Sequence, residues 1–344
     1  MQPIQVTANN FRHFYVGGSS IARFRGLPES NVVSCPEDWV ASTTTRFGEK
    51  RTGLSELPDG RLLTEAIDAD PLAWLGPDHH SRFGSDTCLL VKLLDAQERL
   101  IVHTHPDREF ARTHLGCAHG KTEAWFILET TATNPVVYVG FREPVDADTL
   151  RDWVLNQHTD LLLRTLNAIP VTVGDVILVP AGVPHAIGGG IFIAEVQEPT
   201  DFSVALEWKG YNLDGPNDGH LDLGFDVALE SVDRSAWPAS RLSHLFGPAD
   251  NQSDRQEVLP SPARPFFRIE RVRDGAVLEP SFAVLIATDG SGWLSTATST
   301  VPIRRGESYV VPYAAGASAI TGPVTALRFL PPLSCSAALA SPAV

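Results

Sequence analysis

The stretch Gly174–Gly190 reads GDVILVPAGVPHAIGGG and contains two turn signals around a short apolar run. Gly174 opens the first turn, and the run VILV that follows is typical of a short buried strand. Pro180 and Gly182 favour a second turn, and His185 comes directly after it. The stretch therefore predicts a strand framed by two turns, with an imidazole just beyond the second turn.

A pair of histidines lies upstream, in the stretch Ile101–Phe110, which reads IVHTHPDREF. Alternate side chains of a strand share a face, so His103 and His105 project in the same direction and can both reach one ion. Further along, HGKTEAWFIL places Lys121 and Glu123 on one face of another expected strand. A carboxylate can there join the imidazoles.

The spacing of the glycines, the proline and His185 in Gly174–Gly190 matches the second motif of the cupin superfamily, and HTH matches the paired histidines of the first. Three imidazoles and one carboxylate suit a divalent ion such as zinc, manganese, iron or cobalt. Two carboxylates are candidates for the fourth ligand. Glu109 follows HTH closely, as is usual in cupins, whereas Glu123 lies 18 residues after His105. Spacing alone does not choose between them.

The rest of the chain has the pattern of a mainly β protein. Short apolar runs such as VVYVGF, IFIAEV and FAVLIA recur between turn residues, which is typical of sandwiches and barrels. Helical spacing of apolar residues occurs at 146–166 and, as a second candidate, at 221–233. The polar segment 239–265, rich in Ser, Asp and Pro, predicts a domain boundary.

We therefore expect two cupin (jelly-roll) β-barrel domains with a helical insertion. The first, in 1–255, is the metal-binding domain and carries the insertion around 146–166. The second, in 256–344, is a smaller cupin-like domain, and it contains no histidine and so no imidazole metal site.

Composition excludes several classes of function. The chain of 344 residues is 43% hydrophobic and carries a formal net charge of −14, which repels a phosphate backbone or an anionic membrane surface. We expect neither a nucleic-acid nor a membrane partner, and a cytoplasmic protein, because the N-terminus lacks a signal peptide pattern. The widely spaced Cys35, Cys88, Cys117 and Cys335 form no CxxC pair, so we expect free, mostly buried thiols.

Longer stretches around the motifs resemble type I mannose-6-phosphate isomerases, which are metal-dependent cupins of sugar metabolism. The likeness runs through most of the first 210 residues and includes EDWVAS near Trp39. That family takes its metal from the Gln and His of a QVHP motif, the Glu of GKTE and a His after the PAG turn. Carried over by position, the resemblance implies the ligand set His103, His105, Glu123 and His185. It favours Glu123 over Glu109, replaces the Gln by His103, and makes zinc the most expected ion.

Two positions depart from the family pattern and concern the substrate. The family has a Ser two residues before the Gln that contacts the substrate phosphate together with the Lys of GKTE, and here the matching residue is Ile101. It also has a downstream Arg implicated in catalysis, where this chain has Ala205. Only Lys121 remains of these three groups, and lysine does not reproduce the forked donors of arginine. The resemblance therefore predicts an isomerase of a small-molecule sugar or sugar phosphate, and the two departures leave open an unphosphorylated or otherwise altered sugar.

An aldose–ketose isomerase of the mannose and fructose type works through an enediol intermediate and needs an acid/base group. In GIFIAEVQEPTD, alternation places Ile193, Glu195 and Gln197 on one face, so Glu195 is a candidate acid/base if that face lines the barrel. A structural hydrogen-bond network is the alternative role. The family match favours a substrate contact for Lys121. We predict Glu195 and Lys121 as catalytic residues.

The remaining alternatives concern other histidines and other functions. His79, His80, His114 and His119 are expected to be surface imidazoles. A cupin oxygenase is a second candidate function, because three histidines and a glutamate also hold iron. A non-catalytic carbohydrate-binding or regulatory protein is a third, supported by Ile101 and Ala205. The oligomeric state is left open.

Overall fold

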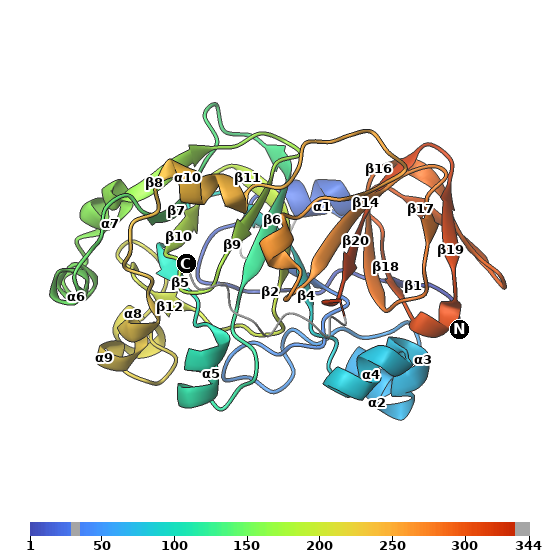
Figure 1. Cartoon of the computed structure of the whole chain (residues 1–344), viewed down its shortest axis with the longest axis horizontal. Helices are drawn as coiled ribbons and strands as arrows, with labels where there is room; N and C mark the ends of the chain where they lie inside the picture. Colours follow the sequence, from blue (N-terminus) through green and yellow to red (C-terminus); the bar gives the residue numbers. More distant parts are fainter. Residues whose placement is uncertain (29–34, 334–344) are drawn as a thin grey trace.

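The structure is a computed structural model that describes residues 1–28 and 35–333. Two β units lie side by side, and the helices lie at their periphery (Figure 1). The prediction of a mainly β, cupin-like fold with a helical insertion is confirmed. None of the described helices is long and apolar enough to cross a membrane.

The first β unit consists of two antiparallel sheets. The six-stranded sheet has the order β2 (Asn10–Phe11), β3 (Glu37–Val40), β4 (Leu90–Ala96), β11 (Ile191–Gln197), β6 (Glu123–Thr130) and β9 (Val176–Val179). The five-stranded sheet has the order β12 (Val204–Ala205), β5 (His103–Thr104), β10 (His185–Ile187), β7 (Val136–Phe141) and β8 (Leu166–Pro170). The two histidine motifs therefore lie on one sheet, and Glu123 and Glu195 lie on the other.

The burial of strand β11 explains why its sequence, IFIAEVQ, is mostly apolar. All seven of its residues are buried, and it pairs with β4 on one side and β6 on the other. Phe192 packs edge-on against Phe24 of helix α1 (Ser20–Arg25), with ring centroids 5.5 Å apart. A strand covered on both faces reads as a continuous hydrophobic run, so the polar Glu195 within it is an exception that needs an explanation.

The second β unit is a nine-stranded sheet system made almost wholly of C-terminal residues. Its strands are β13 (Arg255–Glu257), β14 (Arg268–Val272), β15 (Val277–Leu278), β16 (Ala283–Thr296), β17 (Thr300–Arg304), β18 (Ser308–Val311), β19 (Ser318–Thr321) and β20 (Val324–Leu330), with β1 (Ile4–Val6) as the ninth. Strand β1 pairs antiparallel with β18, with Ile4 opposite Val310. The predicted domain boundary between residues 255 and 256 stays a prediction.

One apolar cluster is shared by the two β units. It contains Ile127 and Ile193 from the first unit, and Phe267, Val284 and Phe329 from the second. Polar contacts join the units as well, because Arg25 forms an ion pair with Asp38 and donates a hydrogen bond to Ser308 Oγ at 3.0 Å. The two barrels therefore pack as one body.

Gly306 is a contact point between α1 and the second β unit. Its φ is +88°, and a Cβ atom placed on it would lie 1.9 Å from the carbonyl oxygen of Phe24. We expect Gly306→Ala to lower the free energy of unfolding by about 3 kcal/mol or more, because the backbone must shift to relieve the clash and alanine is also strained at this positive φ. Gly316, with φ +79° and no atom within 4 Å of such a Cβ, is the matched control, and Gly316→Ala should cost only about 1 kcal/mol. Equal losses in urea unfolding would contradict the contact.

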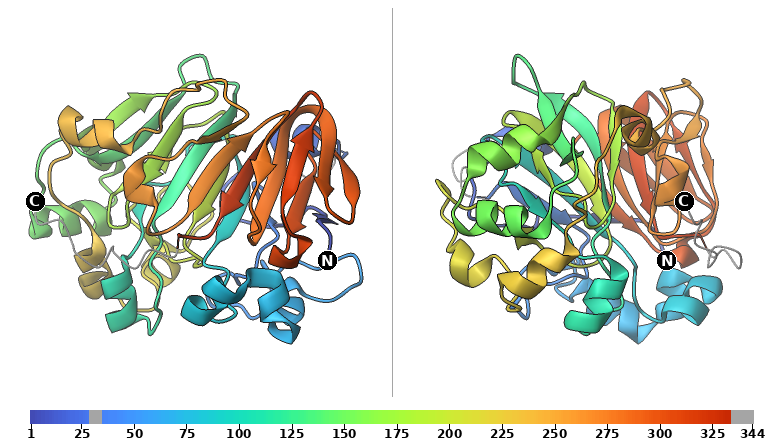
Figure 2. Two further views of the ribbon diagram at one scale, coloured as in Figure 1. Left: turned by 45° about the vertical axis from the view of Figure 1, so that its right-hand side comes forward. Right: turned by 60° about the vertical axis from the view of Figure 1, so that its left-hand side comes forward.

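The predicted helical insertion is present as α6 (Ala147–Leu155) and α7 (Thr159–Thr165), which lie on the side of the first unit far from the second (Figure 2). The Asp146 carboxylate caps α6 by accepting a hydrogen bond from the Thr149 amide. The second predicted helix, at 221–233, was wrong in extent. It is reduced to the short α9 (Phe225–Ala228) and the 3-10 turn η2 (Leu229–Ser231).

Several helices were missed by the sequence analysis. Helices α2 (Leu63–Ala69), α3 (Pro71–Leu75) and α4 (Pro77–Phe83) form a compact group beside the second unit, where Gly76 lies against the ring of Tyr313. Each is too short to show clear periodicity. The other helical segments are α5 (Arg108–His114), α8 (Gly215–Asp218), α10 (Ala239–Leu242), η3 (Ser243–Leu245), η4 (Ser261–Ala263) and η5 (Tyr313–Ala315).

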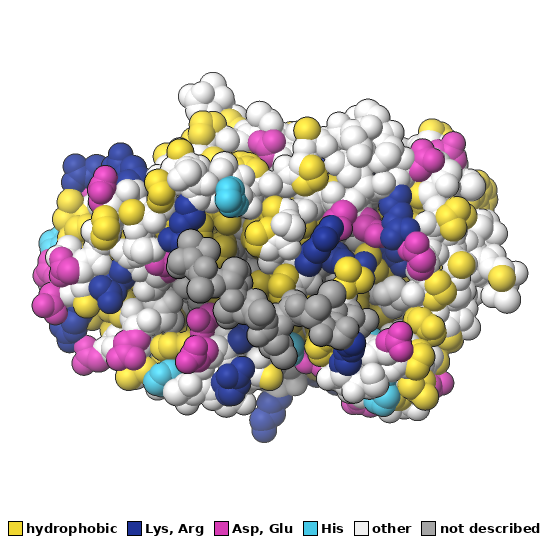
Figure 3. Space-filling view, viewed as in Figure 1, with side chains coloured by type: hydrophobic (Ala, Val, Ile, Leu, Met, Phe, Trp, Pro, Cys, Tyr) yellow, Lys and Arg dark blue, Asp and Glu magenta, His cyan; other side chains and the backbone are white. Residues whose placement is uncertain are grey.

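On the face drawn in Figure 3, Lys and Arg side chains are interspersed with Asp and Glu rather than gathered into one field. This agrees with the net negative charge of the whole chain. Cys35, Cys88 and Cys117 are free, whereas Cys335 lies outside the described residues. Only Cys88 of the three is fully buried, so the expectation of mostly buried thiols was wrong for Cys35 and Cys117.

Candidate metal centre

Three imidazoles meet between the two sheets of the first unit. His103 lies on β5 opposite His185 of β10, and His105 follows β5 directly. The ring centroids are 4.2 Å apart for His103 and His185, 4.8 Å for His105 and His185, and 5.0 Å for His103 and His105. One ring nitrogen from each residue lies within 4.8 Å of the other two. Such a cluster can hold one ion.

The second nitrogen of each ring fixes the tautomer. Each Nδ1 lies within hydrogen-bond distance of a backbone carbonyl: His103 and Ile101 O at 2.9 Å, His105 and Phe202 O at 2.7 Å, His185 and Val183 O at 2.8 Å. A carbonyl oxygen only accepts, so Nδ1 carries the proton in all three rings and Nε2 presents a lone pair. The Nε2 atoms of His105 and His185 are buried and have no hydrogen-bond donor.

Glu123, the first residue of β6, points its carboxylate at these lone pairs. Its Oε2 lies 3.0 Å from Nε2 of His105, and its Oε1 lies 3.3 Å from Nε2 of His185. Imidazole lone pairs and a buried carboxylate that face each other repel unless a cation lies between them. Glu109, the alternative ligand from spacing, is exposed on helix α5 instead.

The electrostatics favour the same protonation states. Burial holds the pKa of His103 well below its usual range and lowers the pKa of His105 to about 3. Burial alone would raise the pKa of Glu123, but His105 and Lys121 outweigh it and hold that pKa well below the ordinary value. Three neutral imidazoles and one ionised carboxylate are the donor set of a divalent metal ion, so these residues fit one.

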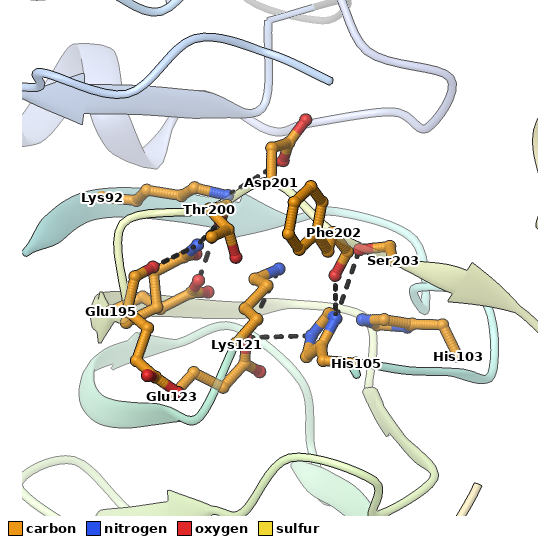
Figure 4. A network of polar contacts seen from close by, with 12 residues as sticks. Lys92, His103, His105, Lys121, Glu123, Glu195, Thr200, Asp201, Phe202 and Ser203 are labelled. Atoms are coloured by element: carbon orange, nitrogen blue, oxygen red, sulfur yellow. Dashed lines mark hydrogen bonds and ion pairs between the residues drawn. The ribbon is translucent and has the colours of Figure 1, made fainter. Parts of the chain in front are cut away.

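The cluster opens into a cavity of about 520 Å³ whose wall includes His103, Glu123, Lys121 and Glu195. Lys121 lies in the loop before β6, not on the strand as predicted, and its Nζ is 3.5 Å from Glu123 Oε2. Its amide donates a hydrogen bond to the carbonyl of Pro106 at 3.0 Å, which fixes the loop. Both predicted catalytic residues therefore line the same cavity as the candidate ligands His103 and Glu123 (Figure 4).

Glu195 faces the cavity from the middle of β11, as its alternation predicted. Its Oε1 is buried without a hydrogen-bond partner. Burial, together with the nearby Glu123 carboxylate, raises the pKa of Glu195 to about 8. A carboxyl group with that pKa can exchange a proton near neutral pH.

The sequence analysis missed a polar group on the neighbouring strands. Lys92 of β4 is buried, and its Nζ lies 3.1 Å from Glu37, 3.9 Å from Asp201 and 4.0 Å from Glu195. Glu37 also accepts a hydrogen bond from the Tyr15 hydroxyl at 2.7 Å. A signal was present, since the apolar strand LLVKLLDA contains a lysine and EDWV contains two carboxylates.

The expectation of surface imidazoles was wrong for His79. It is buried, and its Nε2 lies 2.6 Å from the carbonyl oxygen of Asp86. His119 is half-buried, with Nε2 2.6 Å from the Asp86 carboxylate. His80 is half-buried, whereas His114 is exposed as expected.

The raised pKa of Glu195 predicts a pH effect on stability in the metal-free protein. Its pKa in the folded state, about 8, lies above the unfolded value, so the proton binds the folded state more tightly and the associated stability is lost as pH rises through about 8. We expect a fall of about 2 kcal/mol between about pH 6.5 and pH 8.5. The histidines with lowered pKa titrate below this window. Urea unfolding of wild type and Glu195→Gln checks this, and parallel pH profiles would contradict it.

Comparison with known proteins finds similarity to mannose-6-phosphate isomerases. No family model matches the chain. The chain is 33% identical over 179 residues to mannose-6-phosphate isomerase of Streptococcus mutans. This match covers 49% of this chain and 54% of that enzyme, so the chain spans about half the length of this relative. It is 26% identical over 326 residues to mannose-6-phosphate isomerase ManA of Bacillus subtilis, with 91% and 94% of the two chains covered.

Solved structures show the same fold. The mannose 6-phosphate isomerase of Bacillus subtilis superposes with a TM-score of 0.75 at 20% identity, over 96% of this chain and 99% of that one. A mannose 6-phosphate isomerase described as bound with zinc and yttrium gives a TM-score of 0.73 at 16% identity, over 97% and 100% of the two chains. The likeness extends through both β units.

Proposed function

We propose, on the premise that this chain is a divergent relative of the mannose-6-phosphate isomerases, that it is a metal-dependent isomerase of an aldose and a ketose of the mannose and fructose type. One observation carries the proposal. Buried imidazole lone pairs converge on the Glu123 carboxylate with no proton between them, in a cavity that also holds Glu195 and Lys121.

We infer that His103, His105, Glu123 and His185 hold the ion. Zinc is the most expected metal because imidazole and carboxylate ligands suit it, with manganese, iron and cobalt as alternatives. A bound divalent ion supplies Lewis acidity at the oxygen that becomes negatively charged in an enediol.

Glu195 is the proposed acid/base group. Conversion of an aldose to a ketose removes the proton at C2 and delivers a proton to C1, with the electron pair passing through an enediol. The ionised Glu195 carboxylate accepts the proton from C2 and returns it to C1, while the hydroxyl proton passes from O2 to O1, so no net proton is consumed. Lys121, which faces the cavity beside Glu123, is proposed to donate a hydrogen bond to a substrate hydroxyl.

The wall next to His103 supports a sugar without a phosphate. Ile101 and Ala205 are both buried and both line the cavity there, and neither side chain can donate a hydrogen bond to a phosphate. Ser203 also lines the cavity; its Oγ lies 3.3 Å from the protonated Nδ1 of His105, which leaves its hydroxyl proton available to a sugar oxygen. The substrate proposed here is therefore the unphosphorylated sugar.

The relatives support this function over the two alternatives. The matched proteins are named as isomerases, which favours isomerase chemistry over a cupin oxygenase. The position of Glu195 in the cavity beside the proposed ligands favours catalysis over mere carbohydrate binding. A cytoplasmic location and the absence of nucleic-acid and membrane partners stay predictions.

The test is an isomerase assay of the metal-loaded protein with mannose, fructose and their 6-phosphates, with ketose or aldose formation followed by NMR. We expect turnover that is lost on chelation of the metal and restored by zinc. We also expect the new hydrogen at C1 of the ketose to come either from C2 of the same sugar or, as deuterium, from the solvent. Failure to turn over any of the four sugars, or activity that survives removal of the metal, would contradict the proposal. Oxygen uptake in the same assay would support the oxygenase instead.

A further inference from the structure

The segment 212–222 covers the end of the cavity that contains Ala205, and we refer to it as the cap segment. It includes helix α8, and the Ala205 amide donates a hydrogen bond to the carbonyl of Gly219 at 2.8 Å. A Cβ atom placed on Gly219 would lie only 3.2 Å from Cβ of Ala205. The methyl group of Ala205 therefore packs closely against the cap segment on one side and lines the cavity on the other.

The cap segment presents carboxylates to the cavity and no basic group. The cavity wall includes Leu213, Asp218, Leu221 and Asp222 from this segment. Asp218 and Asp222 are exposed to solvent at the mouth, and neither carboxylate forms an ion pair or accepts a hydrogen bond within residues 1–28 and 35–333. Both therefore have free acceptor oxygens.

The backbone of the cap segment is held in an unusual shape. Leu221 and Asp222 have φ values of +55° and +61°, a region that non-glycine residues rarely occupy. Burial of the Leu221 side chain and a hydrogen bond from the Gly224 amide to His220 Nδ1 at 3.1 Å stabilise the turn. Asp222 thus lies on this turn, and Asp218 is the last residue of helix α8.

The cations of the cavity are already matched by carboxylates. Lys92 lies among Glu37, Asp201 and Glu195, and Lys121 lies beside Glu123. The side chain of Arg46, on the opposite rim, lies 3.5 Å from the Glu49 carboxylate. A phosphate at the Ala205 end would therefore meet Asp218 and Asp222 without an unmatched cation among the described residues of the wall.

We propose that the cap segment determines substrate specificity: Asp218 and Asp222 repel a sugar phosphate and accept hydrogen bonds from the hydroxyl groups at the far end of a neutral sugar. This inference rests on the proposed function for the identity of the sugar. It adds to the proposed function the residues that discriminate between a neutral and a phosphorylated sugar.

The experiment compares binding of mannose and of mannose 6-phosphate to the metal-loaded protein by calorimetry. The test variant is Asp218→Asn with Asp222→Asn, since asparagine keeps an acceptor oxygen but removes the charge. Asp226→Asn with Glu230→Gln is the control, because both residues are exposed close by in sequence and outside the cavity wall. It removes the same two charges.

We expect the test variant to bind mannose 6-phosphate about tenfold more tightly relative to mannose than the wild type does, and the control to change the ratio less than about twofold. Added salt should narrow the difference between wild type and test variant, because screening weakens the repulsion of exposed charges. A purely structural role of the two residues gives no such salt dependence.

Two outcomes overturn the proposal: an unchanged binding ratio in the test variant, or an equal change in the control. Absence of binding of either sugar to the wild type also overturns it. Turnover is measured separately on the same preparations. Mannose that is isomerised while the ratio stays fixed refutes only the role of the cap segment, whereas absence of turnover with normal discrimination in binding refutes only the isomerase function.

Discussion

Replacement of His185 by alanine is expected to leave the protein without stoichiometric metal and to lower kcat/KM by about a thousandfold or more. His185 is fully buried, its Nε2 faces the Glu123 carboxylate at 3.3 Å, and no other described side chain offers a replacement nitrogen at that position. Elemental analysis of the purified variant and steady-state kinetics with mannose measure the two effects.

A matched variant separates metal loss from damage to the fold. His114 is exposed at the end of α5, and His114→Ala should retain full metal content and activity. Circular dichroism and urea unfolding show whether His185→Ala still folds cooperatively. A folded His185→Ala protein with one equivalent of metal and near-normal activity would refute the ligand assignment.

Glu195→Gln is expected to lower kcat by about a hundredfold to ten-thousandfold while KM changes only a few fold. The amide has nearly the same shape as the carboxyl group but cannot accept the C2 proton and return it. Glu195 is not among the three clustered imidazoles or the carboxylate that faces them, so metal content should stay at the wild-type level. Exchange of the C2 proton with solvent should slow in parallel with kcat.

Glu129→Gln is the control for this variant. Glu129 lies on the neighbouring strand β6 but pairs at the surface with Arg23, outside the cavity wall. It should have wild-type kinetics. Normal kcat in Glu195→Gln, with ketose still formed, would assign the proton transfer to another group and leave Glu195 in the structural role that its strand position also allows.

The parts of the site that follow from local spacing could be predicted from the sequence. The alternation in HTH depends on residues two positions apart, so strand geometry predicts that His103 and His105 share a face, whereas the cupin motif match was needed to add His185. Alternation grouped Glu195 with Ile193 and Gln197, but it did not decide whether that face lines the cavity. The choice of Glu123 over Glu109 needed the family resemblance, because the two sheets bring Glu123 to the imidazoles across a long sequence separation.

The parts that depend on distant packing could not be predicted. Lys92 and Glu37 become neighbours only when β3 and β4 pair, so the unusual lysine in the apolar run LLVKLLDA had no visible partner in the sequence. Lys121 departs from its expected strand because its amide bonds to Pro106 instead of entering a ladder. Helices α2 to α4 contain five to seven residues each, which is too few for an amphipathic period to appear.

The pairing of β1 with β18 also has a consequence for how the chain folds. Residues 4–6 and 308–310 are about 300 positions apart, so this ladder closes a very long loop. During synthesis, β1 has no partner strand until β18 has emerged, which is after the described strands of the first β unit. We therefore expect the ladder between β1 and β18 to form late in folding, on top of a first β unit whose strands are already available.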